Sequence, residues 1–308
     1  MSLYKYVAPE RADILKNGVI RFTQPSAFND AFETFPCFTA GLPDEYIQDF
    51  LTNHKPDKLE FEKMLKSSFE AEKSKHPGIR IPFEAIKDSS FVKAAMNQVP
   101  PMVADLFTQF MSGKGALFGR TIRLALEAMN KQFGVLCLAE KPSNLLMWAH
   151  YSNSHSGFVL EFDERHPYFD RRTKEGEFGR CLRKVHYTKA RPQTVLFDPR
   201  LEEDEFRTGW ANDIFFSKSE HWACEEEWRM IEYLKDCPHV IESEPHNIYL
   251  FPIPMDCVTG IIFGCRALDT MKSFIRHLVQ TNPACSHIRI SEAIIDEKEY
   301  VLNFSAAT

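Results

Sequence analysis

The sequence lacks most of the short patterns by which common classes of enzyme are recognised. Neither G-x-x-x-x-G-K-[ST] nor G-x-G-x-x-G occurs in its 308 residues, which argues against a P-loop or a dinucleotide-binding Rossmann fold. G-x-S-x-G and H-E-x-x-H are absent too, which argues against α/β-hydrolases and zinc proteases. Any chemistry must therefore come from a less familiar arrangement of residues.

Closely spaced cysteines are also missing. None of the eight cysteines forms a C-x-x-C pair, and they are scattered along the chain. Such scatter is typical of reduced, buried thiols in a cytosolic protein. His221 and Glu225 have the i, i+4 spacing of a helical metal pair, but no further ligand follows at a suitable spacing, so we predict no metal site.

Long apolar runs do not occur. No run approaches the roughly 18 residues of a membrane span, and no apolar core of a signal peptide follows Met1. We therefore predict a soluble, cytoplasmic protein without a membrane partner.

A strong positive charge is absent as well, because the formal net charge is −6. This argues against a protein that holds nucleic acid through its overall field. The stretch 165–191 is basic-leaning but also contains acidic residues, which is typical of a solvated face. A nucleic-acid-processing enzyme is therefore the weakest of our functional alternatives.

The spacing of apolar residues predicts an α+β fold with a mixed or mostly antiparallel central sheet. Three segments are rich in residues that favour β-strands: Val19–Thr23, Gly134–Leu138 and Trp228–Leu234. Gly134–Leu138 is continuously apolar, as expected of a buried central strand. Strands and helices follow one another in an irregular order, without the repeated strand–helix–strand units of a doubly wound sheet. Residues 44–132 instead show helical spacing. We predict one domain over 1–308 with a helical insertion at 44–132. The functional alternative is that this insertion serves as a lid or a partner-binding arm.

The first candidate site is an aromatic and polar segment, Met147-Trp148-Ala149-His150-Tyr151, followed by His155. On a short helix capped by Ser143 or Asn144, positions i+3 and i+4 would place Met147, His150 and Tyr151 on one face. The alternative is that Trp148 and Tyr151 are core residues and that His150 is structural.

The second candidate site is Glu225-Glu226-Glu227-Trp228-Arg229. If the segment is a strand, Glu225, Glu227 and Arg229 share one face, opposite Glu226 and Trp228. One carboxylate could then hold a ribose hydroxyl and stabilise an oxocarbenium-like cation, the other could act as a base, and the arginine could bind phosphate. The alternative is a surface ladder of salt bridges.

Two further segments carry polar groups that a pocket could use. Tyr4-Lys5-Tyr6 lies near the N-terminus, and Phe28-Asn29-Asp30 combines an aromatic ring with turn-forming residues. Asn29 and Asp30 could form a turn or line a pocket.

Together these segments resemble an uncharacterised, mostly bacterial family known as domain of unknown function 2971. The resembling elements are Leu3–Tyr6, Phe28–Glu33, Met147–Gly157 and Trp222–Arg229. Ala31 stands where the family usually has proline, and no candidate chemical group is lost by this difference. The region 44–132 carries none of the pattern.

A more distant similarity is to ADP-ribosyltransferases, which place a catalytic glutamate on a late strand and bind NAD. Ile14–Gly18 and Glu225-x-Glu227 fit the order of elements in those enzymes, whereas Lys5 differs from their usual histidine or arginine. This similarity implies an enzyme that acts on NAD or another nucleotide, with NAD as substrate and not as a resident cofactor. A non-catalytic sensor or interaction module in bacterial defence is the alternative.

The predicted site residues fall into two groups. The catalytic group is Glu227, Glu225 and His150. The ligand-binding group is Lys5, Tyr6, Asn29, Asp30, Trp148, Tyr151, His155 and Arg229.

Overall fold

The computed structural model describes residues 1–34, 36–40, 114–173, 177–195 and 203–306, together with Lys63, Lys66, Ser67, Glu70 and Gln109. The chain divides into two compact units. The first contains Met1–Pro36, Leu126–Pro192 and Glu202–Thr308, and the second contains Cys37–Ala125 and Gln193–Leu201. Most of the predicted helical insertion at 44–132 lies outside the described residues, so its extent and role stay predictions.

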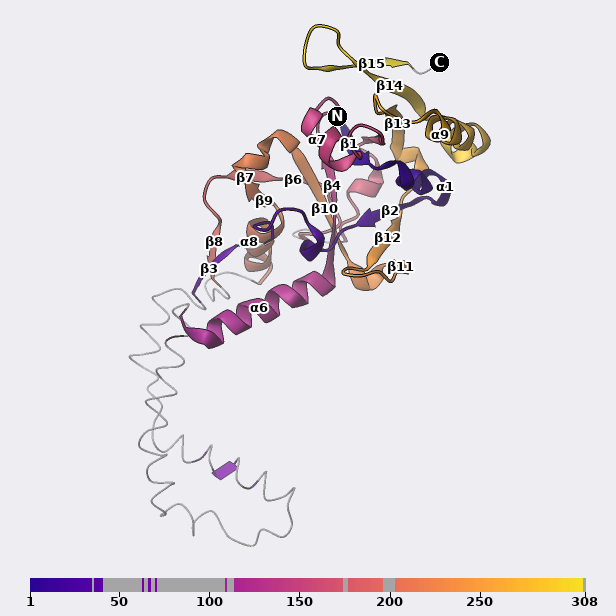
Figure 1. Cartoon of the computed structure of the whole chain (residues 1–308). Helices are drawn as coiled ribbons and strands as arrows, with labels where there is room; N and C mark the ends of the chain where they lie inside the picture. The colour runs from indigo at the N-terminus through magenta and orange to yellow at the C-terminus, as the bar shows by residue number, and fades with distance from the viewer. Residues whose placement is uncertain are drawn as a thin grey trace. The chain divides into compact units, whose positions relative to one another are not determined.

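An eight-stranded sheet forms the centre of the first unit (Figure 1). Its strands, in spatial order, are β15 (Leu302–Ala306), β14 (Arg289–Ile295), β13 (Val258–Phe263), β5 (Phe158–Asp163), β1 (Ser2–Val7), β4 (Phe133–Ala139), β10 (Glu227–Tyr233) and β6 (Arg183–Lys184). Neighbouring strands are antiparallel except β13 and β14, which are parallel. The predicted α+β fold with a mixed, mostly antiparallel sheet is therefore confirmed.

Three small sheets complete the described strands. The first unit has β11 (His239–Ile241), β12 (Ile248–Pro252) and β2 (Val19–Phe22) in one sheet, and β7 (His186–Thr188) with β9 (Ser217–Ser219) in another. The second unit has the parallel pair β3 (Cys37–Ala40) and β8 (Gln193–Val195).

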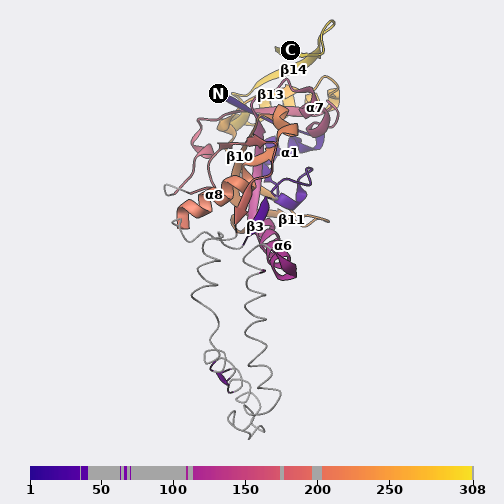
Figure 2. The same cartoon turned by 90° about the vertical axis from the view of Figure 1, so that its left-hand side faces the viewer.

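The described α-helices are α1 (Asp13–Asn17), α6 (Gly115–Gln132), α7 (Leu145–Tyr151), α8 (Glu203–Phe215) and α9 (Asp269–Thr281). Single 3-10 turns are η1 (Pro9–Ala12), η2 (Pro25–Ala27), η3 (Pro167–Phe169), η4 (Glu220–Glu225), η5 (Leu234–Asp236), η6 (Met255–Cys257) and η7 (Pro283–Cys285). Helix α1 ends at Gly18, which adopts the left-handed conformation at φ 62°. Asn17-Gly18 is a sequence signal for the end of a helix, because glycine adopts that conformation without steric cost. Figure 2 shows α1, α7 and α8 around β10 in a view turned by 90°.

The two faces of the central sheet are packed differently. One face carries a large apolar cluster that includes Leu3, Leu136 and Leu160. The other face carries a smaller cluster around Tyr6 and Trp148. This division follows from strand alternation, since successive side chains point to opposite faces. The smaller apolar cluster leaves room for polar groups on the second face.

No helix in the described part of the chain is long and apolar enough to span a membrane.

Candidate functional site

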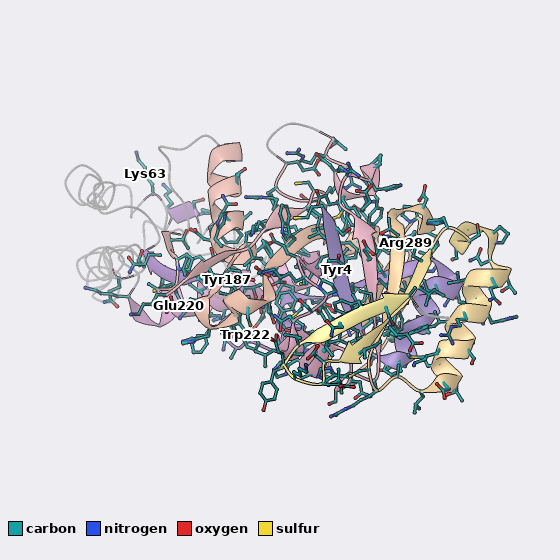
Figure 3. The ribbon with its side chains drawn as sticks, turned by 90° about the horizontal axis from the view of Figure 1, so that it is seen from above. Tyr4, Lys63, Tyr187, Glu220, Trp222 and Arg289 are labelled. Carbon is teal, nitrogen blue, oxygen red and sulfur yellow. The ribbon has the colours of Figure 1, made fainter. Side chains whose placement is uncertain are left out.

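The site begins with a row of residues across three neighbouring strands. Tyr4 of β1 pairs with Ala139 of β4, which in turn pairs with Glu227 of β10. Residues paired across antiparallel strands point to the same face, so Tyr4 and Glu227 flank the small Ala139. Figure 3 shows Tyr4 near the middle of the sheet, between Tyr187 on one side and Arg289 on the other.

Strands β1 and β4 separate beside this row. Tyr4↔Ala139 is their one pair, whereas β1 pairs with β5 from Ser2 to Val7 and β4 pairs with β10 from Phe133 to Ala139. The Lys5 Nζ bridges the opening by donating to the carbonyl oxygen of Cys137 at 2.9 Å. A side chain thereby satisfies a backbone acceptor that a regular ladder would have paired.

A cavity of about 250 Å³ lies at this position. Its wall combines aromatic, acidic and basic side chains from segments far apart in the sequence. The lining residues are Tyr4, Lys5, Tyr6, Arg21, Thr23, Ala27, Phe28, Asn29, Glu33, Cys137, Leu138, Ala139, Met147, Tyr151, Lys218, Glu225 and Glu227. All four sequence elements that resemble the family contribute to this list.

Glu225 reaches the cavity by a different route from the one predicted. It is the last residue of η4 and lies outside strand β10, and Glu226 then reverses the chain in the left-handed conformation at φ 45°. The condition that 225–229 is one continuous strand is therefore not met, since β10 begins at Glu227. The expected separation nevertheless occurs, because Glu226 pairs with Lys141 at 2.8 Å while Glu225 and Glu227 face the cavity.

Lys218 links the two cavity carboxylates. Its Nζ donates to Glu225 Oε2 at 2.6 Å and to Glu227 Oε2 at 3.1 Å, and its side chain is 3% exposed. Trp222 covers it, with the ring centroid 5.2 Å from Nζ. Each charge is thus buried with opposite partners in contact, which offsets the cost of removing it from water.

Arg229 lies behind Glu227 and does not line the cavity. Its Nε and Nη2 donate to the two oxygens of Glu227 at 2.9 and 2.8 Å, and Nη1 donates to the carbonyl oxygen of Phe215 at 2.7 Å. It also pairs with Glu33, and its side chain is 0% exposed. This bidentate geometry fixes the position of the Glu227 carboxylate.

The segment around Asn29 closes the network. Asn29 Nδ2 donates to the Tyr151 hydroxyl at 3.1 Å, and that hydroxyl donates to Glu225 Oε1 at 2.7 Å. Phe28 places its ring 5.4 Å from the Arg229 guanidinium. Asp30 forms a turn by accepting from the Phe32 backbone at 2.9 Å and lies outside the cavity wall.

The buried network holds more negative than positive groups. Glu33, Glu225 and Glu227 face two cations, Lys218 and Arg229. Burial raises the pKa of Glu227 although Lys218 opposes that shift. Burial also lowers the pKa of Lys218, but Glu227 and Glu225 outweigh it and the net shift is upward. The carboxylate end of the cavity therefore favours a ligand that carries hydroxyl groups or positive charge.

Tyr151 is held in its neutral form. Burial first, and then the Glu225 carboxylate, raise the pKa of its hydroxyl. A neutral hydroxyl donates to Glu225 and accepts from Asn29, so it orients the carboxylate.

Three of the predicted site residues support the wall or lie away from it. Trp148 is 0% exposed, packs edge-on against Tyr6 at 5.3 Å and stacks with His155 at 6.2 Å. His155 lines a separate cavity with Cys265 and Arg266. His150 is exposed on α7 and does not line the Glu225 cavity.

The cavity thus brings together six predicted residues: Lys5, Tyr6, Asn29, Tyr151, Glu225 and Glu227. It does not include five others: His150, Asp30, Trp148, His155 and Arg229.

Lys218, Glu33 and Arg21 were not predicted as site residues. Ser217-Lys218-Ser219 is as polar as a solvated strand, and no local pattern shows that its lysine is buried. Glu33 had one available signal, since it ends the Phe28–Glu33 element of the family resemblance. Within the described residues, no group of three or more histidine, cysteine, aspartate or glutamate residues is arranged to hold a metal ion.

The basic-leaning stretch makes internal contacts. Arg171 pairs with the buried Glu232 and lies over the Tyr168 ring. Arg183 binds Asn212 and lies over the Phe216 ring. These two guanidiniums are therefore engaged within the fold.

The model of a family described as "Protein of unknown function (DUF2971)" matches residues 147–230. This range contains Met147–Gly157 and Trp222–Arg229, so the predicted resemblance to that family is confirmed there. Tyr151, Lys218, Glu225, Glu227 and Arg229 all lie within the match. No curated protein matches the chain, and neither does any solved structure.

Proposed function

We propose that the chain is an enzyme that binds a ribose-containing nucleotide, with NAD as the first candidate, and breaks its glycosidic bond. The observation that carries the proposal is the pairing of Glu225 and Glu227 in one cavity beside Tyr6 and Tyr151. Paired carboxylates next to aromatic rings suit a reaction in which a sugar ring becomes positively charged.

In the proposed reaction, the bond between ribose C1 and the nicotinamide nitrogen breaks, and its electron pair leaves with nicotinamide. The oxocarbenium-like ribose is then attacked by the oxygen of water or of an acceptor hydroxyl. The proton of that attacking group passes to a carboxylate. The products are nicotinamide and a ribosyl group bonded to the new oxygen, and no oxidant or reductant is needed.

The two carboxylates differ in how they are held. Arg229 and Lys218 fix Glu227 through donors on both of its oxygens, so it would act as a fixed negative charge beside the cationic ribose. Glu225 is bonded by Tyr151 and Lys218, both of which line the cavity, so it would accept the proton. This division keeps Glu227 as the principal catalytic carboxylate and Glu225 as its partner.

The cavity size restricts which part of the ligand is enclosed. At about 250 Å³ it is smaller than the roughly 300–1,000 Å³ typical of sites that enclose a drug-sized ligand. We therefore expect the ribose and its leaving group to enter the cavity while the rest of a dinucleotide remains outside.

Nicotinamide release from NAD by the purified full-length chain tests the proposal. We expect Glu225→Gln and Glu227→Gln each to lower the rate by roughly 10²-fold or more, as for loss of an acid–base group. Glu226→Gln is the matched control, because Glu226 lies between them in sequence but pairs with Lys141 away from the cavity. The proposal is wrong if no nicotinamide is released and no nucleotide raises the melting temperature.

A further inference from the structure

The wall of the cavity formed by β1 and β2 is basic. Lys5 of β1 and Arg21 of β2 both line it. Arg11 is close enough for its charge to disfavour the charged forms of both. This wall is therefore positively charged, whereas the end of the cavity that holds Glu225 and Glu227 is negatively charged.

Arg21 has no acidic partner in the described part of the chain. Its Nε is buried without a hydrogen-bond partner, and none of the described salt bridges includes its guanidinium. Burial first, and then Arg11, lower the pKa of Arg21. An unpaired cation that is partly removed from water destabilises a protein unless something offsets it. An anion in the cavity beside Arg21 would offset this charge.

Lys5 joins the two ends of the cavity. Its Nζ donates to the carbonyl oxygen of Cys137, and this leaves donor capacity on an ammonium that has three N–H groups. Burial lowers the pKa of Lys5, and Arg11 and Arg21 lower it further, while the Glu227 carboxylate opposes the shift. Lys5 therefore lies between the acidic end of the cavity, which suits hydroxyl groups of a ligand, and the basic end, which suits an anionic group.

We propose that Lys5 and Arg21 form a phosphate subsite, so that the ligand is a phosphorylated ribose with its sugar toward Glu225 and Glu227. This inference rests on the proposed function for the sugar end, and it extends that function by naming the phosphate group and the residues that bind it. Arg21 takes the role first predicted for Arg229, which is fully buried against Glu227 and Glu33.

A guanidinium beside an ammonium suits phosphate in particular. Arginine offers parallel N–H donors that match two phosphate oxygens, and lysine adds a point charge. Arg11 lies nearby and lowers the pKa of Arg21; its Nε pairs with Asp13 at 3.1 Å, and its Nη2 is buried without a partner. A doubly charged phosphate neutralises more of this field than a single carboxylate would.

Binding without turnover tests the subsite. The melting temperature and calorimetric affinity of the full-length chain are measured with inorganic phosphate, ribose 5-phosphate and ribose. We expect ribose 5-phosphate to bind more tightly than ribose, and Arg21→Met to weaken binding of both phosphate probes by about tenfold or more. Arg165→Met is the control, since that side chain is 79% exposed and lies outside the cavity.

A second readout separates ligand binding from a structural role. In phosphate-free buffer Arg21→Met should melt at the same temperature as the wild type or higher, because it removes an unpaired cation. A lower melting temperature combined with an undiminished phosphate response would overturn the inference, and so would a wild-type protein that binds neither phosphate probe. Arg21-dependent binding without nicotinamide release would support the subsite while rejecting NAD cleavage.

Discussion

Lys218 determines how the acidic residues of the site are arranged. A buried ammonium must be paired, and here one Nζ contacts Glu225 and Glu227 and lies 3.6 Å from Glu33. Without it, Glu33 and Glu227 would keep their contact with Arg229, whereas Glu225 would lose its salt bridge. Removing one partner of a buried ion pair costs more than the pair contributes, because the remaining charge stays buried.

Lys218→Met should therefore lower the free energy of unfolding by about 3–5 kcal/mol at neutral pH, measured by urea denaturation. Lys141→Met is the matched control. Its ammonium pairs with Glu226 through a side chain that is 61% exposed, so the expected loss is about 0–1 kcal/mol. Equal losses in the two variants would contradict the importance of the buried pair.

The same variant should show a distinct pH dependence. Burial raises the pKa of Glu227 above its ordinary value of 4.5, so its carboxyl group binds a proton more tightly in the folded state than in the unfolded chain. The stability linked to this group is fully present below that ordinary value and is lost as pH rises through the folded pKa. Removal of Lys218 raises the pKa further, so we expect the deficit of Lys218→Met to be smaller near pH 5 than near pH 7.5. A deficit that grows toward acidic pH would show that removing Lys218 does not raise the pKa of Glu227.

Individual residues differed in how far the sequence revealed their role. Glu225, Glu227 and Tyr151 were predictable because they stand in short segments that combine charge with aromatic rings. Lys218 was not, because a lysine between two serines has no local sign of burial. Arg229 was recognised as part of the site, but only the three-dimensional structure places its guanidinium behind Glu227.

At the level of elements, the junction between α7 and β5 holds the aromatic wall in place. Asn144 caps α7 by accepting from Leu146 and Met147 at 2.9 and 3.2 Å, as predicted for this position. The chain then passes through Asn153, Ser154 and His155, all at positive φ. Gly157 follows, and a Cβ there would collide with the carbonyl oxygen of Val7. The tight approach of this turn to β1 therefore requires glycine.

Gly157→Ala should lower the free energy of unfolding by about 1–3 kcal/mol, because backbone must move to admit the methyl group. Gly209→Ala is the contrasting variant. Gly209 lies in α8, where a Cβ would meet nothing within 4 Å, so alanine should raise stability by about 0.5–1 kcal/mol. Thermal unfolding of both proteins measures the difference in sign. A neutral Gly157→Ala would mean that the junction can relax without cost.

Element boundaries were predictable where side-chain patterns determine them, and not where a single backbone angle does. The apolar run at 134–138 corresponds to strand β4, and Asn17-Gly18 corresponds to the end of α1. The reversal at Glu226 left no signal, because glutamate rarely adopts a positive φ. The sequence also predicts a helix over 198–218. Helix α8 ends at Phe215 and Ser217–Ser219 forms β9, so the predicted C-terminal boundary lies too late.

At the scale of the whole molecule, the order of strands is the property that the sequence did not show. The first strand, β1, lies between β5 and β4, and β10 lies next to β4 although more than 80 residues separate Ala139 from Glu227. Such pairings depend on packing between distant segments, whereas strand patterns are local. This order is what brings the scattered elements between residues 3 and 229 to one cavity.

The cysteines provide a probe of how the first unit unfolds as a whole. All eight lie in the described part and are free, and their exposure differs widely. Cys224 is exposed, whereas Cys257 and Cys285 are buried in the large apolar cluster and Cys181 is buried elsewhere in the first unit. Burial raises the pKa of Cys257 to about 12, so its reactive thiolate is scarce in the folded protein.

With Ellman's reagent at mildly alkaline pH, we expect Cys224 to react quickly in the native protein and Cys224→Ser to lack that fast phase. Cys181, Cys257 and Cys285 should react together, at a common rate that denaturant increases, because each becomes accessible only when the shared core opens. Mass spectrometry of partially labelled protein distinguishes the sites. If one buried thiol reacts well before the other two, the strands around it open independently, and the central sheet does not unfold as a single cooperative unit.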